Sequence, residues 1–224
     1  MENVVTDESW RKVRETIEDV NFLLGPYFAN QALKAPRHLL FTLARYKFAA
    51  KMLIPGVASS VLELGCGEGF GTLLLAEGGN DVTGVDFDDA AIDHAQAHID
   101  SSNCRFLHDA FLGKTYGAFD AVVSIDVVEH IEKKCENEFL KTLVGNLGPH
   151  GMAVVGTPNE TAARYASKGS EIGHVNLFTA DRLSAFLRTG FHNVFVFSMN
   201  DEVVHTGFHP MAHYLMALAC GPKG

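Results

Sequence analysis

Three glycines that alternate with other residues follow a short apolar run, and they indicate a ligand-binding loop. Gly65, Gly67 and Gly69 come directly after residues 61–64, in which Glu63 is the one acid. Glycine lets a backbone approach a ligand that a Cβ would displace, and it reaches backbone angles that other residues avoid. A carboxylate beside such a loop repels a pyrophosphate but suits a cation. Glu63 therefore favours a positively charged ligand at the loop.

The loop departs from the dinucleotide pattern Gly-x-Gly-x-x-Gly, because Phe70 stands where the third glycine would be. Residues 61–69 (VLELGCGEG) instead resemble the first motif of the class I S-adenosylmethionine-dependent methyltransferases, which is hydrophobic-x-(Asp/Glu)-x-Gly-x-Gly-x-Gly. S-adenosylmethionine carries an ammonium and a sulfonium group and no phosphate, so an acid before the loop suits it. The resemblance implies cofactor contacts from Glu63, Gly65, Cys66, Gly67 and Gly69.

Two further acids end the next expected strands. Asp86 lies about 20 residues past the glycines, where a carboxylate can accept hydrogen bonds from both ribose hydroxyls. Phe87 follows it, and we expect its ring to pack on adenine. The resemblance implies that Asp109, with Ala110 beside it, lies by the adenine amino group. Because both acids follow the glycine loop in this order along the chain, together they predict a bound nucleoside.

The expected fourth strand, residues 119–125, is followed by a motif that resembles the Glu-His-Ile of the same family. Ligands of open α/β sheets bind beyond the carboxyl ends of strands, near the switch in strand order. We therefore expect Ile125 and Asp126 close to the methionine part of the cofactor. Glu129 and His130 either take part in the site or cap the helix that follows.

An Arg45-Tyr46 pair lies in an expected helix before the first motif. Related enzymes often carry such a pair near the methionine carboxylate, and a guanidinium binds a carboxylate bidentately. The resemblance thus implies cofactor binding by both residues. The alternative is a surface arginine beside a core tyrosine.

Methyl transfer to a hydroxyl also requires a base that takes the proton, and a histidine near neutrality suits that task. His174 ends a polar segment after the fifth strand and is the first candidate, with His130 as the second. The alternative for His174 is a cap of the following helix or a bond to a backbone carbonyl.

The candidate cofactor-binding and catalytic residues can meet at one edge of a sheet only if the strands that precede them end side by side. The 224-residue chain suits one α/β domain with a modest extension. Strand, glycine turn and helix form the first crossover of a nucleotide-binding fold. The resemblance implies a Rossmann-like, doubly wound, seven-stranded sheet with helices on both faces. It is expected to be mostly parallel, with an antiparallel terminal strand over residues 214–220.

Two helices are expected before the first strand. One runs from Thr6 to about Leu24, where Gly25-Pro26 ends it, and the other covers about Pro36 to Leu53. Beyond the fifth strand a long polar segment is expected to bind the acceptor. The expected divisions are residues 1–56 for an N-terminal helical cap, 57–224 for the S-adenosylmethionine-binding domain and 157–178 for the acceptor segment.

The composition of the chain limits the classes of binding partner and the cellular compartment that we expect. The net charge of −9 argues against a nucleic-acid partner, which needs a basic face. Four scattered cysteines without a CxxC pair read as reduced thiols, and the acidic N-terminus does not resemble a signal peptide. No apolar run is long enough to span a membrane. We expect a soluble cytoplasmic protein.

Eleven histidines raise the question of a metal. His205, His209 and His213 recur every fourth residue, but Gly207 and Pro210 interrupt any helix that would align them. We expect no metal, although some ubiquinone-pathway O-methyltransferases with similar motifs use a divalent ion. A convergence in space of Asp126, Glu129, His130 and His174 stays open.

The chain resembles small-molecule methyltransferases near the ubiquinone-pathway O-methyltransferases and those of surface-polysaccharide pathways. The function predicted is methyl transfer from S-adenosylmethionine, which leaves S-adenosylhomocysteine, to a hydroxyl of a sugar or another small metabolite. The alternative within the class is N-methylation of an amino sugar or small amine. From other classes, a nicotinamide-dependent oxidoreductase and a non-catalytic cofactor-binding subunit remain.

Overall fold

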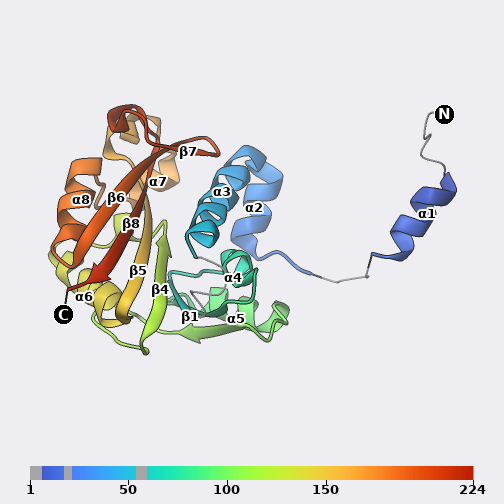
Figure 1. The fold of residues 1–224 in the computed structure, drawn as a ribbon. Helices are drawn as coiled ribbons and strands as arrows, with labels where there is room; N and C mark the ends of the chain where they lie inside the picture. The colour runs from blue at the N-terminus through green and yellow to red at the C-terminus, as the bar shows by residue number, and fades with distance from the viewer. Residues whose placement is uncertain (1–6, 18–21, 54–59, 224) are drawn as a thin grey trace, which may run out of the picture.

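The computed structural model describes residues 7–17, 22–53 and 60–223 of the chain. Residues 22–53 and 60–223 form a sheet with helices around it, whereas the helix Asp7–Glu15 stands apart from them (Figure 1). The sheet has eight strands in the order β3-β2-β1-β4-β5-β8-β6-β7. Their bounds are β1 Ser60–Leu64, β2 Asp81–Asp86, β3 Cys104–His108, β4 Phe119–Ile125, β5 Leu147–Pro158, β6 Phe191–Asn200, β7 Val203–His205 and β8 Tyr214–Pro222.

The predicted doubly wound fold is confirmed. Strands β3, β2, β1, β4 and β5 pair in parallel, and β8 runs antiparallel between β5 and β6. The predicted terminal antiparallel strand is therefore present. The sheet has one strand more than the seven expected, because the short β7 folds back on β6 after a turn in which Asp201 has φ 50°. The order reverses between β1 and β4, which puts the switch point beside the glycine loop.

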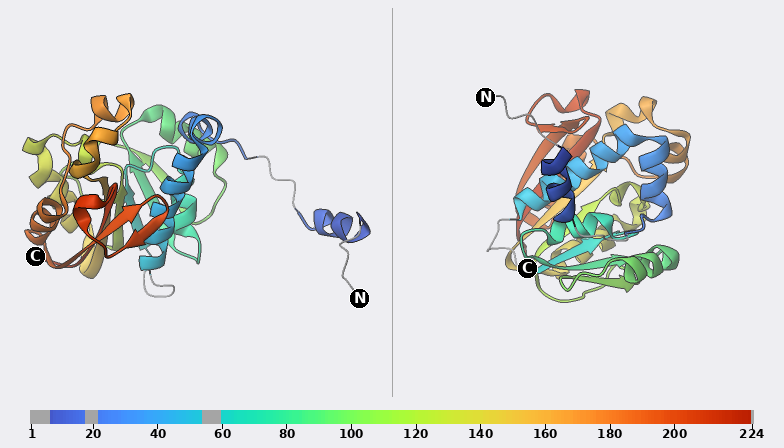
Figure 2. Two further views of the ribbon diagram at one scale, coloured as in Figure 1. Left: turned by 90° about the horizontal axis from the view of Figure 1, so that it is seen from above. Right: turned by 90° about the vertical axis from the view of Figure 1, so that its right-hand side faces the viewer.

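Helices cover both faces of the sheet, as Figures 1 and 2 show. One core packs α6 and α8 against strand residues such as Leu62 and Val122, and the other packs α3 and α4 against their neighbours Val61 and Val123. This alternation follows from the two-residue period of a strand. The helices are α1 Asp7–Glu15, α2 Pro26–Lys34, α3 Pro36–Met52, α4 Phe70–Ala76, α5 Asp89–His98, α6 Glu136–Gly145, α7 Lys168–Gly173 and α8 Ala180–Arg188.

The N-terminal part differs from the prediction. The expected helix to Leu24 is wrong, since α1 ends at Glu15, and Gly25-Pro26 begins the unpredicted α2 instead of ending a helix. Proline fits the first position of a helix because its missing N–H needs no partner there. The α3 helix agrees with the predicted 36–53. Thr6, residues 18–21 and the boundary near residue 56 lie outside the described residues.

The segment after β5 contains short helices. Residues 157–178 include the 3₁₀ helix η3 (Glu160–Tyr165) and α7. Short turns of the same type occur at η1 (Val128–His130), η2 (Lys133–Cys135) and η4 (His209–Met211). His205, His209 and His213 fall in β7, in η4 and just before β8, so the expected interruption of a common helix is confirmed. Among the described residues, no helix has the length and hydropathy that crossing a membrane requires.

Candidate functional site

The glycine loop joins the carboxyl end of β1 to α4. Gly65, Gly67 and Gly69 have φ values of 79°, 52° and 80°, in the left-handed region that favours glycine. A Cβ at Gly65 would lie 2.3 Å from Val127, and one at Gly69 would lie 2.6 Å from Ile99. A Cβ at Gly67 would meet nothing within 4 Å. Packing therefore demands two of the glycines, whereas the space over Gly67 is open and could take a ligand.

Asp86 ties this loop to β2. Its buried carboxylate accepts a hydrogen bond from the Gly67 amide at 2.8 Å and from the Asp88 amide at 3.0 Å. The two bonds go to different oxygens, and each oxygen keeps a further lone pair. The carboxylate that sequence analysis assigned to the ribose is thus fixed beside the open glycine.

Glu63 lies behind the loop. Its side chain is 1% exposed, and its two oxygens accept from Tyr46 Oη at 2.8 Å and Thr72 Oγ1 at 2.5 Å. Burial raises the pKa of Glu63 to about 7. Cys66 is also buried, and burial raises the pKa of its thiol. The Tyr46 hydroxyl of the predicted Arg-Tyr pair therefore bonds Glu63.

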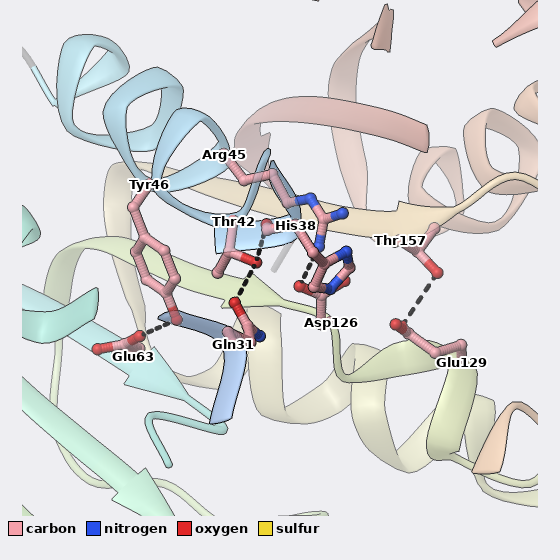
Figure 3. A network of polar contacts seen from close by, with 9 residues as sticks. All are labelled: Gln31, His38, Thr42, Arg45, Tyr46, Glu63, Asp126, Glu129 and Thr157. Carbon is pink, nitrogen blue, oxygen red and sulfur yellow. Dashed lines mark hydrogen bonds and ion pairs between the residues drawn. The ribbon is translucent and has the colours of Figure 1, made fainter. Parts of the chain in front are cut away.

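Arg45 and Asp126 meet at the end of β4, although 81 residues separate them in the chain (Figure 3). Arg45 Nη1 lies 2.5 Å from Asp126 Oδ2, and the guanidinium stacks on the Tyr214 ring at 3.9 Å. Asp126 has φ 57°. The alternative of a surface arginine is wrong, because Arg45 is buried. Among the described residues, Arg45 Nε and Tyr214 Oη have no hydrogen-bond partner.

The residues assigned to adenine lie at the ends of β2 and β3. Phe87 is 71% exposed, and Asp109 accepts from Tyr116 Oη at 2.9 Å and from the Lys114 ammonium. These two bonds, that from Lys114 foremost, hold the pKa of Asp109 below its usual range. Ala110 is exposed beside it. Sequence reasoning missed Lys114, although its place five residues after the acid was visible.

The two candidate bases lie side by side. The rings of His130 and His174 are 5.0 Å apart and nearly perpendicular. His130 Nδ1 is 2.8 Å from the Gly173 carbonyl oxygen, so Nδ1 carries the proton and Nε2 is left with a lone pair. Burial and the neighbouring His130 lower the pKa of His174. The capping alternative for His174 is wrong, since Thr179 caps α8.

Glu129 completes this group. Its side chain is 0% exposed, Oε2 accepts from Thr157 at 3.1 Å, and Oε1 has no partner among the described residues. Burial, and then the Asp126 carboxylate, raises the pKa of Glu129 well above its ordinary value. Glu129, His130 and His174 each offer a ligand atom, and these atoms lie within 4.8 Å of one another. The group could hold a metal ion, whereas the nearby Asp126 is occupied by Arg45.

Sequence comparisons relate this chain to methyltransferases. Residues 61–151 match a family model described as a methyltransferase domain. A probable S-adenosylmethionine-dependent methyltransferase of Mycolicibacterium smegmatis is 35% identical over 44% of this chain and 38% of its own length. A mitochondrial ubiquinone biosynthesis O-methyltransferase of Arabidopsis thaliana is 36% identical over 47% of this chain and 34% of its own. The chain thus spans less than half the length of these two relatives.

Solved structures share the fold. The N-methyltransferase NodS from Bradyrhizobium japonicum WM9 superposes with a TM-score of 0.61 at 22% identity, over 85% of this chain and 99% of that one. The glycine loop at the switch point, the acid at the end of β2 and these matches lead to one conclusion. Residues 61–151 of this chain form a methyltransferase domain similar to that of S-adenosylmethionine-dependent methyltransferases.

Proposed function

We propose that the chain transfers the methyl group of S-adenosylmethionine to a hydroxyl of a small metabolite such as a sugar. The acceptor oxygen attacks the methyl carbon in line with the sulfur, so that a carbon–oxygen bond forms as the carbon–sulfur bond breaks. Sulfur keeps the electron pair, and S-adenosylhomocysteine leaves. Holding the reactants in line can contribute roughly 7–11 kcal/mol.

Cofactor binding is assigned to the carboxyl edge of β1, β2, β3 and β4. The open space over Gly67 and the fixed Asp86 carboxylate support a nucleoside there. Phe87, Asp109 and Ala110 are assigned to adenine. Arg45, Tyr46, Glu63, Ile125 and Asp126 are assigned to the methionine end, where the unpartnered Nε of Arg45 supports a carboxylate.

The proposed reaction at the acceptor hydroxyl is supported by the pair of histidines beyond β4. A lowered pKa leaves His174 neutral near pH 7, so its imidazole can accept the hydroxyl proton. His130 lies 5.0 Å away, between ring centroids, and can share or replace that role.

A divalent cation is the second candidate for the acceptor half. The unpartnered oxygen of the buried Glu129 favours it, because a buried carboxylate without a counter-charge is costly. Glu129, His130 and His174 would hold the ion, and its charge would lower the pKa of the acceptor hydroxyl. In that case His174 would bind metal and could not serve as the base.

Further proposals concern the alternative reaction, the compartment, the partners and the domain divisions of the chain. An N-methyltransferase acting on an amino sugar or small amine is the alternative, and the likeness to NodS supports it. Four unpaired cysteines support a cytoplasmic protein, and the net charge of −9 supports small acceptors over nucleic acid. We keep residues 1–56 as a cap, 57–224 as the methyltransferase domain and 157–178 as the acceptor segment.

A product-mass screen tests the proposal. The protein is incubated with S-adenosylmethionine and sets of sugars, phenols and amines, and products are searched for the gain of one methyl group. Gain on a hydroxyl supports O-methylation, whereas gain only on amines overturns it. Repeating the active reaction after chelation, with and without added Mg²⁺ or Zn²⁺, separates the two acceptor mechanisms. Full activity without metal favours His174 as the base.

A further inference from the structure

Glu68 links the glycine loop to the N-terminal cap. It lies between Gly67 and Gly69, yet its carboxylate is bonded to the start of α2. The Tyr27 amide donates to Oε1 at 2.7 Å, and the Phe28 amide donates to Oε2 at 3.2 Å. Both oxygens are thus engaged by a segment about 40 residues away in the chain.

These two amides need a partner from elsewhere. The first amides of a helix have no partner within it, and a side chain at the N-cap usually supplies one. The N-cap of α2 is Gly25, which makes no side-chain cap bond. Glu68 supplies the missing acceptor, and its negative charge suits the positive end of the helix dipole.

The Glu68 carboxylate occupies the space that a side chain at residue 25 would take. A Cβ built there would lie 2.2 Å from Glu68 Cδ and 2.4 Å from Oε2. Gly25 itself is buried. The absence of a side chain at residue 25 is therefore what lets the Glu68 carboxylate reach the helix. This steric fit is independent of the hydrogen bonds.

Apolar contacts hold the same two segments together. The Phe70 ring, at the start of α4, lies 5.8 Å from Phe22 and 5.1 Å from Phe28, between centroids. His94 Nε2 in α5 is 3.1 Å from the Leu23 carbonyl oxygen. Residues 22–28 thus pack on the two helices that follow the cofactor strands.

The same α2 helix also contacts α3, the helix that carries Arg45. The buried Gln31 of α2 accepts a hydrogen bond at Oε1 from Thr42 Oγ1 of α3, 3.4 Å away and three residues before Arg45 (Figure 3). Through α2, the glycine loop is therefore connected to the helix whose arginine is assigned to the methionine end of the cofactor.

We propose that Glu68 is a positioning residue that latches α2 to the glycine loop, so that the loop and the Arg45 end of the cofactor site are held in one geometry through α2. This proposal rests on the proposed function of the loop. When the loop has the geometry that binds cofactor, Glu68 fixes the start of α2. Without the latch, α2 moves independently and cofactor dissociates faster. The methyl transfer itself is unaffected.

Amide exchange followed by NMR tests the contact without any cofactor. In Glu68→Ala, the Tyr27 and Phe28 amides should exchange roughly 5- to 10-fold faster, which is the usual size of a lost cap. Amides bonded within α2, such as that of Gln31, should change less. Glu77→Ala, which removes an exposed acid at the far end of α4, is the matched control and should change neither. Unchanged exchange at Tyr27 and Phe28 in Glu68→Ala would overturn the latch.

A double-mutant cycle separates the latch from general destabilisation. Gly25→Ala should disrupt the same contact from the other side and speed the same exchange. Because both changes remove one interaction, the double variant should be no faster than the worse single variant. Additive effects would mean that the two residues act separately, and the proposal would be wrong.

Cofactor kinetics test the coupling. Added S-adenosylmethionine should slow exchange at Tyr27 in the wild type and not in Glu68→Ala, and the dissociation rate should rise roughly 5- to 10-fold in the variant. The KM for S-adenosylmethionine should rise while kcat at saturation is kept. Equal slowing in both proteins would refute the coupling. If the wild type binds no S-adenosylmethionine, the proposed function fails, while the exchange experiment without cofactor still decides the contact.

Discussion

The buried Glu63 makes folding stability depend on pH with a definite sign. Burial raises its pKa from 4.5 to about 7 in the folded chain. Between these values the folded state keeps a proton that the unfolded state has released, so stability falls as pH rises through this window. A shift of this size corresponds to about 3 kcal/mol. Glu63→Gln keeps the shape and cannot ionise, so this loss should vanish.

Urea unfolding of both proteins between pH 4.5 and 8 measures the effect. The free energy of unfolding of Glu63→Gln minus that of the wild type should rise with pH by about 3 kcal/mol and level off above pH 7. Glu129, whose pKa is also raised, contributes to both proteins and cancels in the difference. Glu77→Gln, an exposed acid, should give no such rise. Parallel curves for Glu63→Gln and wild type would refute the reasoning.

Three other predictions concern the site. Asp86→Ala should weaken S-adenosylmethionine binding roughly 10- to 150-fold, because a charged acceptor is lost; unchanged affinity of the folded variant in titration calorimetry would count against the ribose assignment. Gly67→Val should abolish cofactor binding in the same assay while far-ultraviolet circular dichroism stays unchanged, since a branched side chain fills the open space; normal binding would put the ligand elsewhere. His174→Ala should bind cofactor as the wild type does and turn over about 10²- to 10⁴-fold more slowly, with residual activity that rises with pH. If His130→Ala loses turnover instead, the base is His130, and if neither does, the acceptor needs no protein base.

The fold was predictable because its signals are local. The glycine loop follows its strand directly, and Asp86 ends the next strand. The cap of α8 by Thr179 is a local signal of the same kind, because a cap directly precedes its own helix. Gly25-Pro26 was wrongly predicted to end a helix, because such a pair occurs at both ends of helices. The pair begins α2, and its role there depends on Glu68, far along the chain.

The electrostatics of the site could not be predicted from the sequence. Arg45 was expected at the cofactor carboxylate, and its additional pairing with Asp126, 81 residues away, was not predicted. Tyr214 stacks on Arg45. It lies in the apolar last strand, so the sequence alone indicates a core residue at this position. The grouping of Glu129 with His130 and His174 depends on how α7 packs against η1. These contacts arise from tertiary packing, which no local pattern encodes.

Isothermal titration of the wild-type protein with S-adenosylmethionine, S-adenosylhomocysteine and NAD tests the central claim most directly. The claim is that the glycine loop binds S-adenosylmethionine. We predict saturable binding of S-adenosylmethionine and S-adenosylhomocysteine, no binding of NAD, and loss of both heats in Gly67→Val. Binding of NAD in place of S-adenosylmethionine, or saturable binding of S-adenosylmethionine that Gly67→Val leaves unchanged, would contradict the account.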